Sequence, residues 1–182
     1  MGWTVKKTIV LVGMMGAGKT AVGKALAARF DVPFLDSDAE IQNAANMTIA
    51  EIFERDGEAF FRAKESEVLE RLLDDDTKGV LSTGGGAFLA QGNRDLISSK
   101  GVSVCLQADL DLLWNRVKHK TTRPLLRTSD PRATLSQLYD QRANIYALAD
   151  LSVQAHADYS IDDMTDRVIE ALMARPDVVE KS

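Results

Sequence analysis

Eight residues near the N-terminus have the types and spacing of a phosphate-binding loop. The segment GMMGAGKT matches the pattern G-x-x-x-x-G-K-[ST]. Its glycines let several backbone N–H groups point at phosphate oxygens, and the N-terminus of the following helix adds partial positive charge. Lys19 would then bridge the β- and γ-phosphates of a nucleotide, and the Thr20 hydroxyl would bind Mg²⁺. The predicted loop residues are Gly13, Met14, Met15, Gly16, Ala17, Gly18, Lys19 and Thr20.

Two carboxylates follow a short apolar run that predicts a strand. Asp36 and Asp38 stand two residues apart, and alternation along a strand would send them to the same side. One could hold Mg²⁺ or its waters, and the other could accept a proton from a substrate hydroxyl. An aspartate in this position also commonly caps the next helix, so both interpretations stay open.

Two arginines occupy inward positions on apolar helical stripes. In the helix expected from Glu58, Arg62 and Glu65 are spaced i, i+3 and can pair, as charges on such a stripe require. Arg142 has a similar position on a later helix. Two inward guanidinium groups indicate a site for a carboxylate or a phosphate, unless they reach solvent from the edges of the stripes.

A glycine triplet and a basic segment are two further candidates for ligand binding. Gly84, Gly85 and Gly86 follow a third apolar run and would allow the backbone to approach a ligand closely, although they could also form a plain turn. They replace the acidic Mg²⁺ ligand that many phosphate-loop proteins carry there, which makes Asp36 the better candidate. The range 116–142 holds seven Lys or Arg against two Asp, and it predicts either a basic loop over the nucleotide or a solvated loop.

Alternating strands and helices must position these residues. This pattern predicts βαβ units and a mostly parallel sheet that is covered on both faces. The expected strands are 8–12, 34–38, 79–83, 102–106 and 151–153. The expected helices are 20–30, 49–57, 58–73, one through 112–117, 133–146 and 160–175, with an irregular stretch at 118–132. Because 39–73 exceeds one crossover, we expect it to form a flap over the carboxyl ends of the strands, where such sheets bind ligands.

Composition narrows the class of protein. A chain of 182 residues with 45% apolar side chains suits one globular domain. The net charge of −5 disfavours nucleic acids and anionic membranes as partners. We expect a cytoplasmic protein because neither a signal peptide nor an apolar stretch of about 20 residues is evident. Cys105, in an apolar run, is interpreted as an inert core thiol.

In the order and spacing of these motifs, residues 8–172 resemble the shikimate kinase family. The resemblance rests on the phosphate loop, Asp36-Ser37-Asp38, and IAEIF from Ile49. It rests further on Gly57-Glu58, Phe61-Arg62 with Glu65, the glycine triplet, RPLL from Arg123, and Arg142 followed by Tyr146. It implies an α/β P-loop fold with a five-stranded parallel sheet in the order 2-3-1-4-5. It also implies one kinase domain over 1–182, with a flap at about 39–73 and a lid at about 118–132.

The resemblance implies transfer of the γ-phosphoryl group of ATP to the 3-hydroxyl of shikimate, with Mg²⁺, in aromatic amino acid (chorismate) biosynthesis. The enzyme would act as a monomer. The implied catalytic residues are Lys19, Asp38 and Arg123. The implied shikimate site comprises Asp38, Phe53, Phe61, Arg62, Gly84, Gly85, Gly86 and Arg142, with Glu65 orienting Arg62. Thr20 and Asp36 would serve Mg²⁺, Arg116 would lie along the adenine, and Arg123 would reach the phosphates from the lid.

One segment departs from the family pattern. Residues 154–160 lack the Arg- and Pro-containing adenine loop, so the adenine contacts there are unassigned. Two other functions stay open at this point. One is a kinase of a different small hydroxy acid, such as gluconate, or of a nucleoside monophosphate. The other is a non-catalytic ATP-binding module that regulates a partner.

Overall fold

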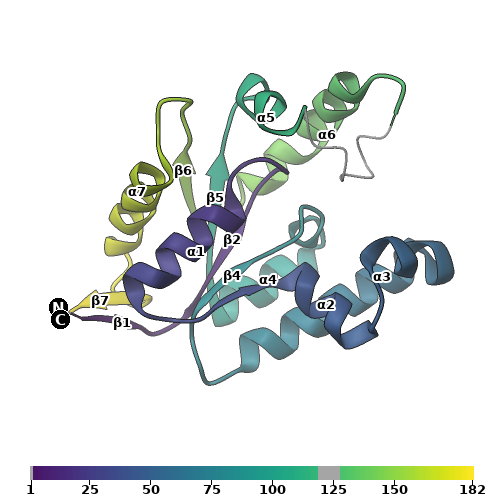
Figure 1. Cartoon of the computed structure of the whole chain (residues 1–182). Helices are drawn as coiled ribbons and strands as arrows, with labels where there is room; N and C mark the ends of the chain where they lie inside the picture. Colours follow the sequence, from purple (N-terminus) through teal and green to yellow (C-terminus); the bar gives the residue numbers. More distant parts are fainter. Residues whose placement is uncertain (1, 119–127) are drawn as a thin grey trace.

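A five-stranded parallel sheet forms the centre of the molecule (Figure 1). The computed structural model describes residues 2–118 and 128–182. The strands of the sheet are β2 (Thr8–Val12), β3 (Phe34–Asp36), β4 (Val80–Ser82), β5 (Gly101–Gln107) and β6 (Leu151–Gln154). Their order is β3-β4-β2-β5-β6, all parallel. Counted along the chain, this is the order 2-3-1-4-5, which confirms the predicted fold class.

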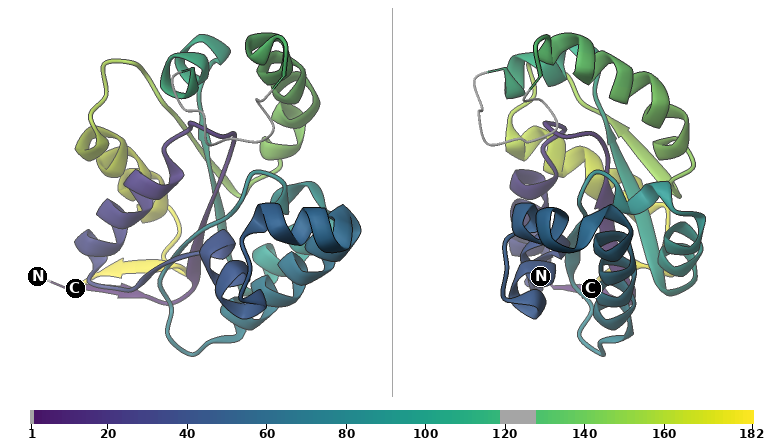
Figure 2. Two further views of the ribbon diagram at one scale, coloured as in Figure 1. Left: turned by 45° about the vertical axis from the view of Figure 1, so that its right-hand side comes forward. Right: turned by 90° about the vertical axis from the view of Figure 1, so that its right-hand side faces the viewer.

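Helices cover both faces of the sheet, as the unbroken apolar runs of its central strands require. All five residues of β2 are buried. On one face lie α1 (Lys19–Phe30) and α7 (Ile161–Met173), which pack together. On the other face lie the long α3 (Ile49–Asp74) and α4 (Gln91–Lys100) (Figure 2). Near the carboxyl ends of the strands, α5 (Leu110–Val117) packs beside α6 (Pro131–Tyr146).

The predicted flap is helical and has a small core of its own. It is built from α2 (Ser37–Ala45) and α3, which begins at the predicted capping box of Thr48 and Glu51. Element α3 contains the two helices predicted here, separated by a kink at Gly57, whose φ of 86° and ψ of 172° are not helical. The buried side chains shared by α2 and α3 are Ile41, Ile52, Phe61 and Val68. Further along α3, Leu69 and Leu73 belong to the main core, which anchors the flap to the sheet.

Several short elements were not predicted from the sequence. The strands β1 (Trp3–Val5) and β7 (Val179–Lys181) pair antiparallel and bring the two ends of the chain together (Figure 1). The 3₁₀-helix η1 (Ala87–Leu89) and the polar helix α4 follow the glycine triplet. Three-residue elements are too short to show a period, and α4 buries few side chains, so neither gives an apolar pattern.

The start of α6 lies two residues before the predicted position. Helix α6 begins at Pro131 instead of 133, because Asp130 caps it by accepting a hydrogen bond from the Ala133 N–H at 3.1 Å. Most of the predicted irregular stretch, 119–127, lies outside the described residues. Of the helices in the described part of the chain, none has the length and apolarity needed to cross a membrane.

Candidate active site

The predicted phosphate loop connects β2 to α1. Gly16 and Gly18 adopt positive φ values of 83° and 98°, a conformation that glycine accepts without strain. Lys19 begins α1, and its ammonium group donates hydrogen bonds to the carbonyl oxygens of Gly13 at 2.7 Å and Met14 at 3.1 Å. The lysine thus folds back along the loop. With the N-terminus of α1 behind it, the loop has the arrangement of an anion-binding cradle.

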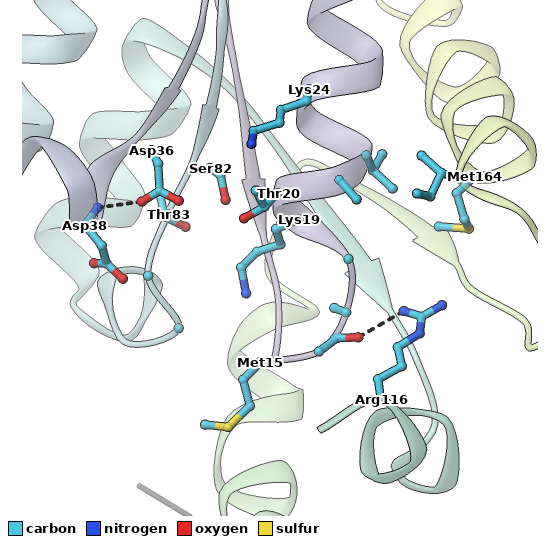
Figure 3. A pocket seen from close by; sticks show the side chains of 18 of the residues that line it. Met15, Lys19, Thr20, Lys24, Asp36, Asp38, Ser82, Thr83, Arg116 and Met164 are labelled. Atoms are coloured by element: carbon cyan, nitrogen blue, oxygen red, sulfur yellow. Dashed lines mark hydrogen bonds between the residues drawn. The ribbon is translucent and has the colours of Figure 1, made fainter. Parts of the chain in front are cut away.

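A cavity of about 790 Å³ opens beside this loop. Its walls include Thr20 from α1, Asp36 from β3, Ser82 from β4, and Met164 from α7. Figure 3 shows Asp36 and Asp38 on one side of Lys19 and Thr20, and Arg116 and Met164 on the other. The predicted loop residues that line the cavity are Met15, Gly16, Ala17, Gly18, Lys19 and Thr20. Gly13 and Met14 instead supply the carbonyl groups that hold Lys19.

Arg116 connects the loop to α5. Its guanidinium group donates a hydrogen bond to the Gly16 carbonyl at 2.9 Å and lines the cavity. Another member of the basic range, Arg132, pairs with the exposed Asp111 at 2.7 Å. The basic residues of 116–142 therefore do not all face the cavity: Arg116 lines it, whereas Arg132 pairs with an exposed aspartate. Arg123 lies outside the described residues.

Asp36 and Asp38 both line the cavity, but the strand-alternation argument is wrong for Asp38. Helix α2 begins at Ser37, so Asp38 lies in its first turn. Asp36 caps this helix, since its Oδ1 accepts hydrogen bonds from the N–H groups of Asp38 at 2.9 Å and Ala39 at 3.3 Å. Burial raises the pKa of Asp38, and the charge of Asp36 raises it further, against the opposing charges of Lys19 and Arg62. A carboxylate with a raised pKa is a stronger proton acceptor than an ordinary aspartate.

The oxygen donors here fit Mg²⁺ held with a nucleotide. The Thr20 hydroxyl and the Asp36 carboxylate face the same cavity (Figure 3). Within the described ranges, no three or more His, Cys, Asp or Glu side chains gather into a group that could hold a metal ion alone. Mg²⁺ typically binds one or two protein oxygens together with phosphates and waters, so this sparse donor set is of the kind it uses.

The glycine triplet brings three predicted substrate-binding side chains to one place. A Cβ atom built on Gly84 would lie 2.6 Å from Oδ1 of Asp38. A Cβ on Gly85 would lie 3.3 Å from Nη1 of Arg142, and one on Gly86 would lie 2.3 Å from Nη1 of Arg62. The sequence predicted close approach of this backbone to a ligand. In the structure it is approached by the side chains of the protein itself, which come from three separate helices.

Arg62 and Glu65 pair as predicted. Nη1 of Arg62 donates to Oε1 of Glu65 at 3.0 Å, and the Glu65 side chain is 2% exposed, against 33% for Arg62. Burial raises the pKa of Glu65, while the charge of Arg62 and its hydrogen bond work against that rise. Glu65 therefore holds one edge of the guanidinium group from inside the protein. Nε of Arg62 lies 3.6 Å from the exposed Glu58, and the guanidinium group stays partly accessible.

The two predicted phenylalanines have different environments. Phe61 is 4% exposed and belongs to the flap core, with the guanidinium group of Arg62 5.2 Å from its ring centre. Phe53 is 37% exposed, and its ring centre lies 4.8 Å from that of Phe61. Phe53 can contact a ligand directly. Phe61 supports both Phe53 and Arg62 from behind.

The cavity also contains residues that the sequence analysis missed. Lys24 lies one helical turn after Thr20 and lines the same wall (Figure 3). Its i+4 spacing from Thr20 was a signal that could have identified it. Tyr159, Ile161 and Met164, at the start of α7, line the cavity as well. No spacing pattern connected these three to the phosphate loop, which precedes them by about 140 residues of sequence.

A phosphate loop at the carboxyl edge of a parallel sheet, with a carboxylate and two arginines gathered beside it, defines a P-loop kinase of small molecules. Comparisons with known proteins identify the particular family. The family model described as shikimate kinase matches residues 15–173. The chain therefore belongs to the shikimate kinase family, as its motifs predicted.

Individual relatives agree over nearly the whole chain. It is 66% identical to a shikimate kinase of Ruegeria pomeroyi over 97% of this chain and 90% of that protein. It is 63% identical to a shikimate kinase of Cereibacter sphaeroides, over 97% of this chain and 87% of that protein. Among solved structures, a shikimate kinase of Acinetobacter baumannii in complex with shikimate aligns with a TM-score of 0.85 at 35% identity, covering 92% of this chain and 93% of the other.

Proposed function

We propose that this protein transfers the γ-phosphoryl group of ATP to the 3-hydroxyl of shikimate, giving shikimate 3-phosphate and ADP in the route to chorismate and the aromatic amino acids. The observation that carries the proposal is the glycine triplet, which contacts Asp38, Arg62 and Arg142 at the edge of the phosphate-loop cavity. A proton acceptor and two carboxylate-binding groups are thereby combined beside a nucleotide site.

The nucleotide would bind with its phosphates in the loop and its base toward α7. Lys19 and the loop N–H groups would hold the phosphates, and Arg116 would lie along the adenine. The apolar side chains of Ile161 and Met164 offer a surface for a planar base. Mg²⁺ would be held from the protein side by Thr20 and Asp36. Its contribution when bound is neutralisation of phosphate charge.

The acceptor would bind at the glycine triplet. Arg62 and Arg142 would hold its carboxylate, because guanidinium groups bind carboxylates through paired hydrogen bonds. Glu65 fixes Arg62 at 3.0 Å and so reduces the entropy lost on binding. Phe53, supported by Phe61, would contact the ring, and the three glycines would supply backbone contacts. Asp38 would accept the proton of the 3-hydroxyl as that oxygen attacks.

The protein contributes mainly positioning and charge stabilisation to this transfer. The transition state spreads negative charge over the transferred phosphoryl oxygens, and Lys19 is placed to follow that charge. From the resemblance, Arg123 would add a second positive group from the lid. Because every residue with a proposed role comes from one chain, we also propose that the enzyme acts as a monomer. We further propose that it acts in the cytoplasm and that 39–73 serves as the acceptor flap.

The test measures ADP release from Mg-ATP with shikimate, gluconate and nucleoside monophosphates as separate acceptors. We expect turnover with shikimate that exceeds turnover with either control by orders of magnitude. Lys19→Ala should lose this activity while retaining its circular dichroism spectrum, since Lys19 lies at the loop and outside the core. Preferential phosphorylation of gluconate or a nucleotide would refute the substrate assignment. ATP binding without turnover on any acceptor would favour a regulatory module.

A further inference from the structure

Tyr146 is a buried residue that none of the roles above uses. It is the last residue of α6, one turn after Arg142, and is 3% exposed. Its hydroxyl donates a hydrogen bond to the carbonyl oxygen of Gly85. Its ring stacks on the buried Phe88, with ring centres 6.5 Å apart and planes 23° apart. The ring therefore packs in the core, while the hydroxyl reaches the glycine triplet.

The same hydroxyl lies beside Arg142. A Cβ atom built on Gly85 would be 3.3 Å from Nη1 of Arg142 and 3.6 Å from the hydroxyl oxygen of Tyr146. Burial raises the pKa of Tyr146, while the positive charge of the neighbouring Arg142 works in the opposite direction. A tyrosine hydroxyl can donate one hydrogen bond and accept others, so the hydroxyl that donates to the Gly85 carbonyl keeps acceptor capacity for the nearby guanidinium group.

We infer that the Tyr146 hydroxyl is a positioning group that fixes Arg142 and the Gly85 backbone in the geometry that binds the acceptor carboxylate. This inference rests on the proposed function. Glu65 fixes Arg62 on the other side of the triplet, so both arginines lie beside a buried polar side chain. An arginine side chain has many rotamers, and holding it in place before binding lowers the cost of ordering it with the ligand.

The Tyr146→Phe variant separates this role from packing, because it keeps the ring on Phe88 and removes only the hydroxyl. We expect the KM for shikimate to rise about five- to tenfold, the size expected for one lost neutral hydrogen bond. The KM for ATP and the circular dichroism spectrum should be unchanged. Tyr139→Phe is the matched control, because Tyr139 is on the same helix and its hydroxyl has no hydrogen-bond partner in the described ranges. We expect no change in either KM for this control.

A double-mutant cycle with Arg142→Ala tests whether Tyr146 acts through the arginine. The fold-decrease in kcat/KM for shikimate caused by Tyr146→Phe should be less than half as large in the Arg142→Ala background as in the wild type. The reason is that the arginine positioned by the hydroxyl is already absent. Fully additive effects would overturn the inference. So would a shikimate KM within twofold of the wild type, or an equal rise in the KM for ATP.

The outcomes for the two proposals remain distinct. If the wild-type enzyme does not phosphorylate shikimate, the proposed function fails. If the wild type is active and Tyr146→Phe behaves like Tyr139→Phe, only the positioning role fails.

Discussion

A single methyl group added at Gly86 should damage acceptor binding without unfolding the protein. The new Cβ atom would lie 2.3 Å from Nη1 and 2.4 Å from Nη2 of Arg62, whereas non-bonded contacts of this kind are comfortable at about 3.5 Å. The guanidinium group must therefore move by about 1 Å. The backbone of Gly86, with φ −91° and ψ −11°, is open to alanine, so the strain falls on Arg62 alone.

The expected losses of stability and of activity follow from the contacts that Arg62 loses when it moves. Displacing Arg62 disrupts its 3.0 Å hydrogen bond to Glu65, which is 2% exposed, so the folded state should lose about 1–3 kcal/mol. A domain of ordinary stability, about 5–15 kcal/mol, survives that loss. A hydrogen bond to a charged group contributes about 1.5–3 kcal/mol, or about 10- to 150-fold in affinity, so we expect kcat/KM for shikimate to fall by about that range, mainly through KM.

Two other glycines calibrate the effect. In Gly85→Ala the Cβ would lie 3.3 Å from Arg142, so a shift of a few tenths of an ångström suffices and a loss of only several-fold is expected. Gly92→Ala, in α4, is the control, because its Cβ would meet nothing within 4 Å. Alanine is also the better helix former by about 1 kcal/mol. Gly92→Ala should therefore leave both KM values unchanged.

The assay titrates shikimate at saturating Mg-ATP and follows ADP release, with thermal unfolding measured on the same samples. A Gly86→Ala enzyme whose shikimate KM stays within twofold of the wild type would refute the reasoning. An equal rise in the KM for ATP would also refute it, because the clash would then have spread beyond the acceptor site.

Three further predictions concern charge and burial. Asp38→Asn should raise the melting temperature at pH 8, and the gain should shrink near pH 4; a pH-independent gain would contradict this. The sign follows because burial raises the pKa of Asp38, so its ionised form destabilises the folded state above that pKa, and the penalty disappears on protonation. Burial raises the pKa of Cys105 to about 11, so iodoacetamide at pH 8 should label the denatured protein at least about 100-fold faster than the native one; similar rates would exclude an inert thiol. Arg62→Ala or Arg142→Ala should raise the shikimate KM by at least about tenfold with a smaller change in kcat, since a carboxylate contact persists from ground state to transition state; a large fall in kcat at constant KM would argue against that role.

Local patterns in the sequence were sufficient for part of the site. The phosphate loop is a continuous segment, and the pairing of Arg62 with Glu65 follows from positions three apart on one helix. The alternation of apolar runs and helical stripes likewise predicted the parallel sheet. Even so, local reasoning was wrong where an element boundary fell inside a motif. Asp38 was assigned to a strand by alternation, yet α2 begins one residue before it.

The tertiary structure decided which distant residues meet. Gly85 and Tyr146 are 61 residues apart and are joined by a hydrogen bond, and no period within either segment encodes that contact. The same holds for Met164, which reaches the phosphate-loop cavity from the start of α7. Sequence periodicity records only which face of an element is buried. The neighbour on that face is set by the order of strands in the sheet and by how the helices pack across it, and these depend on the whole chain.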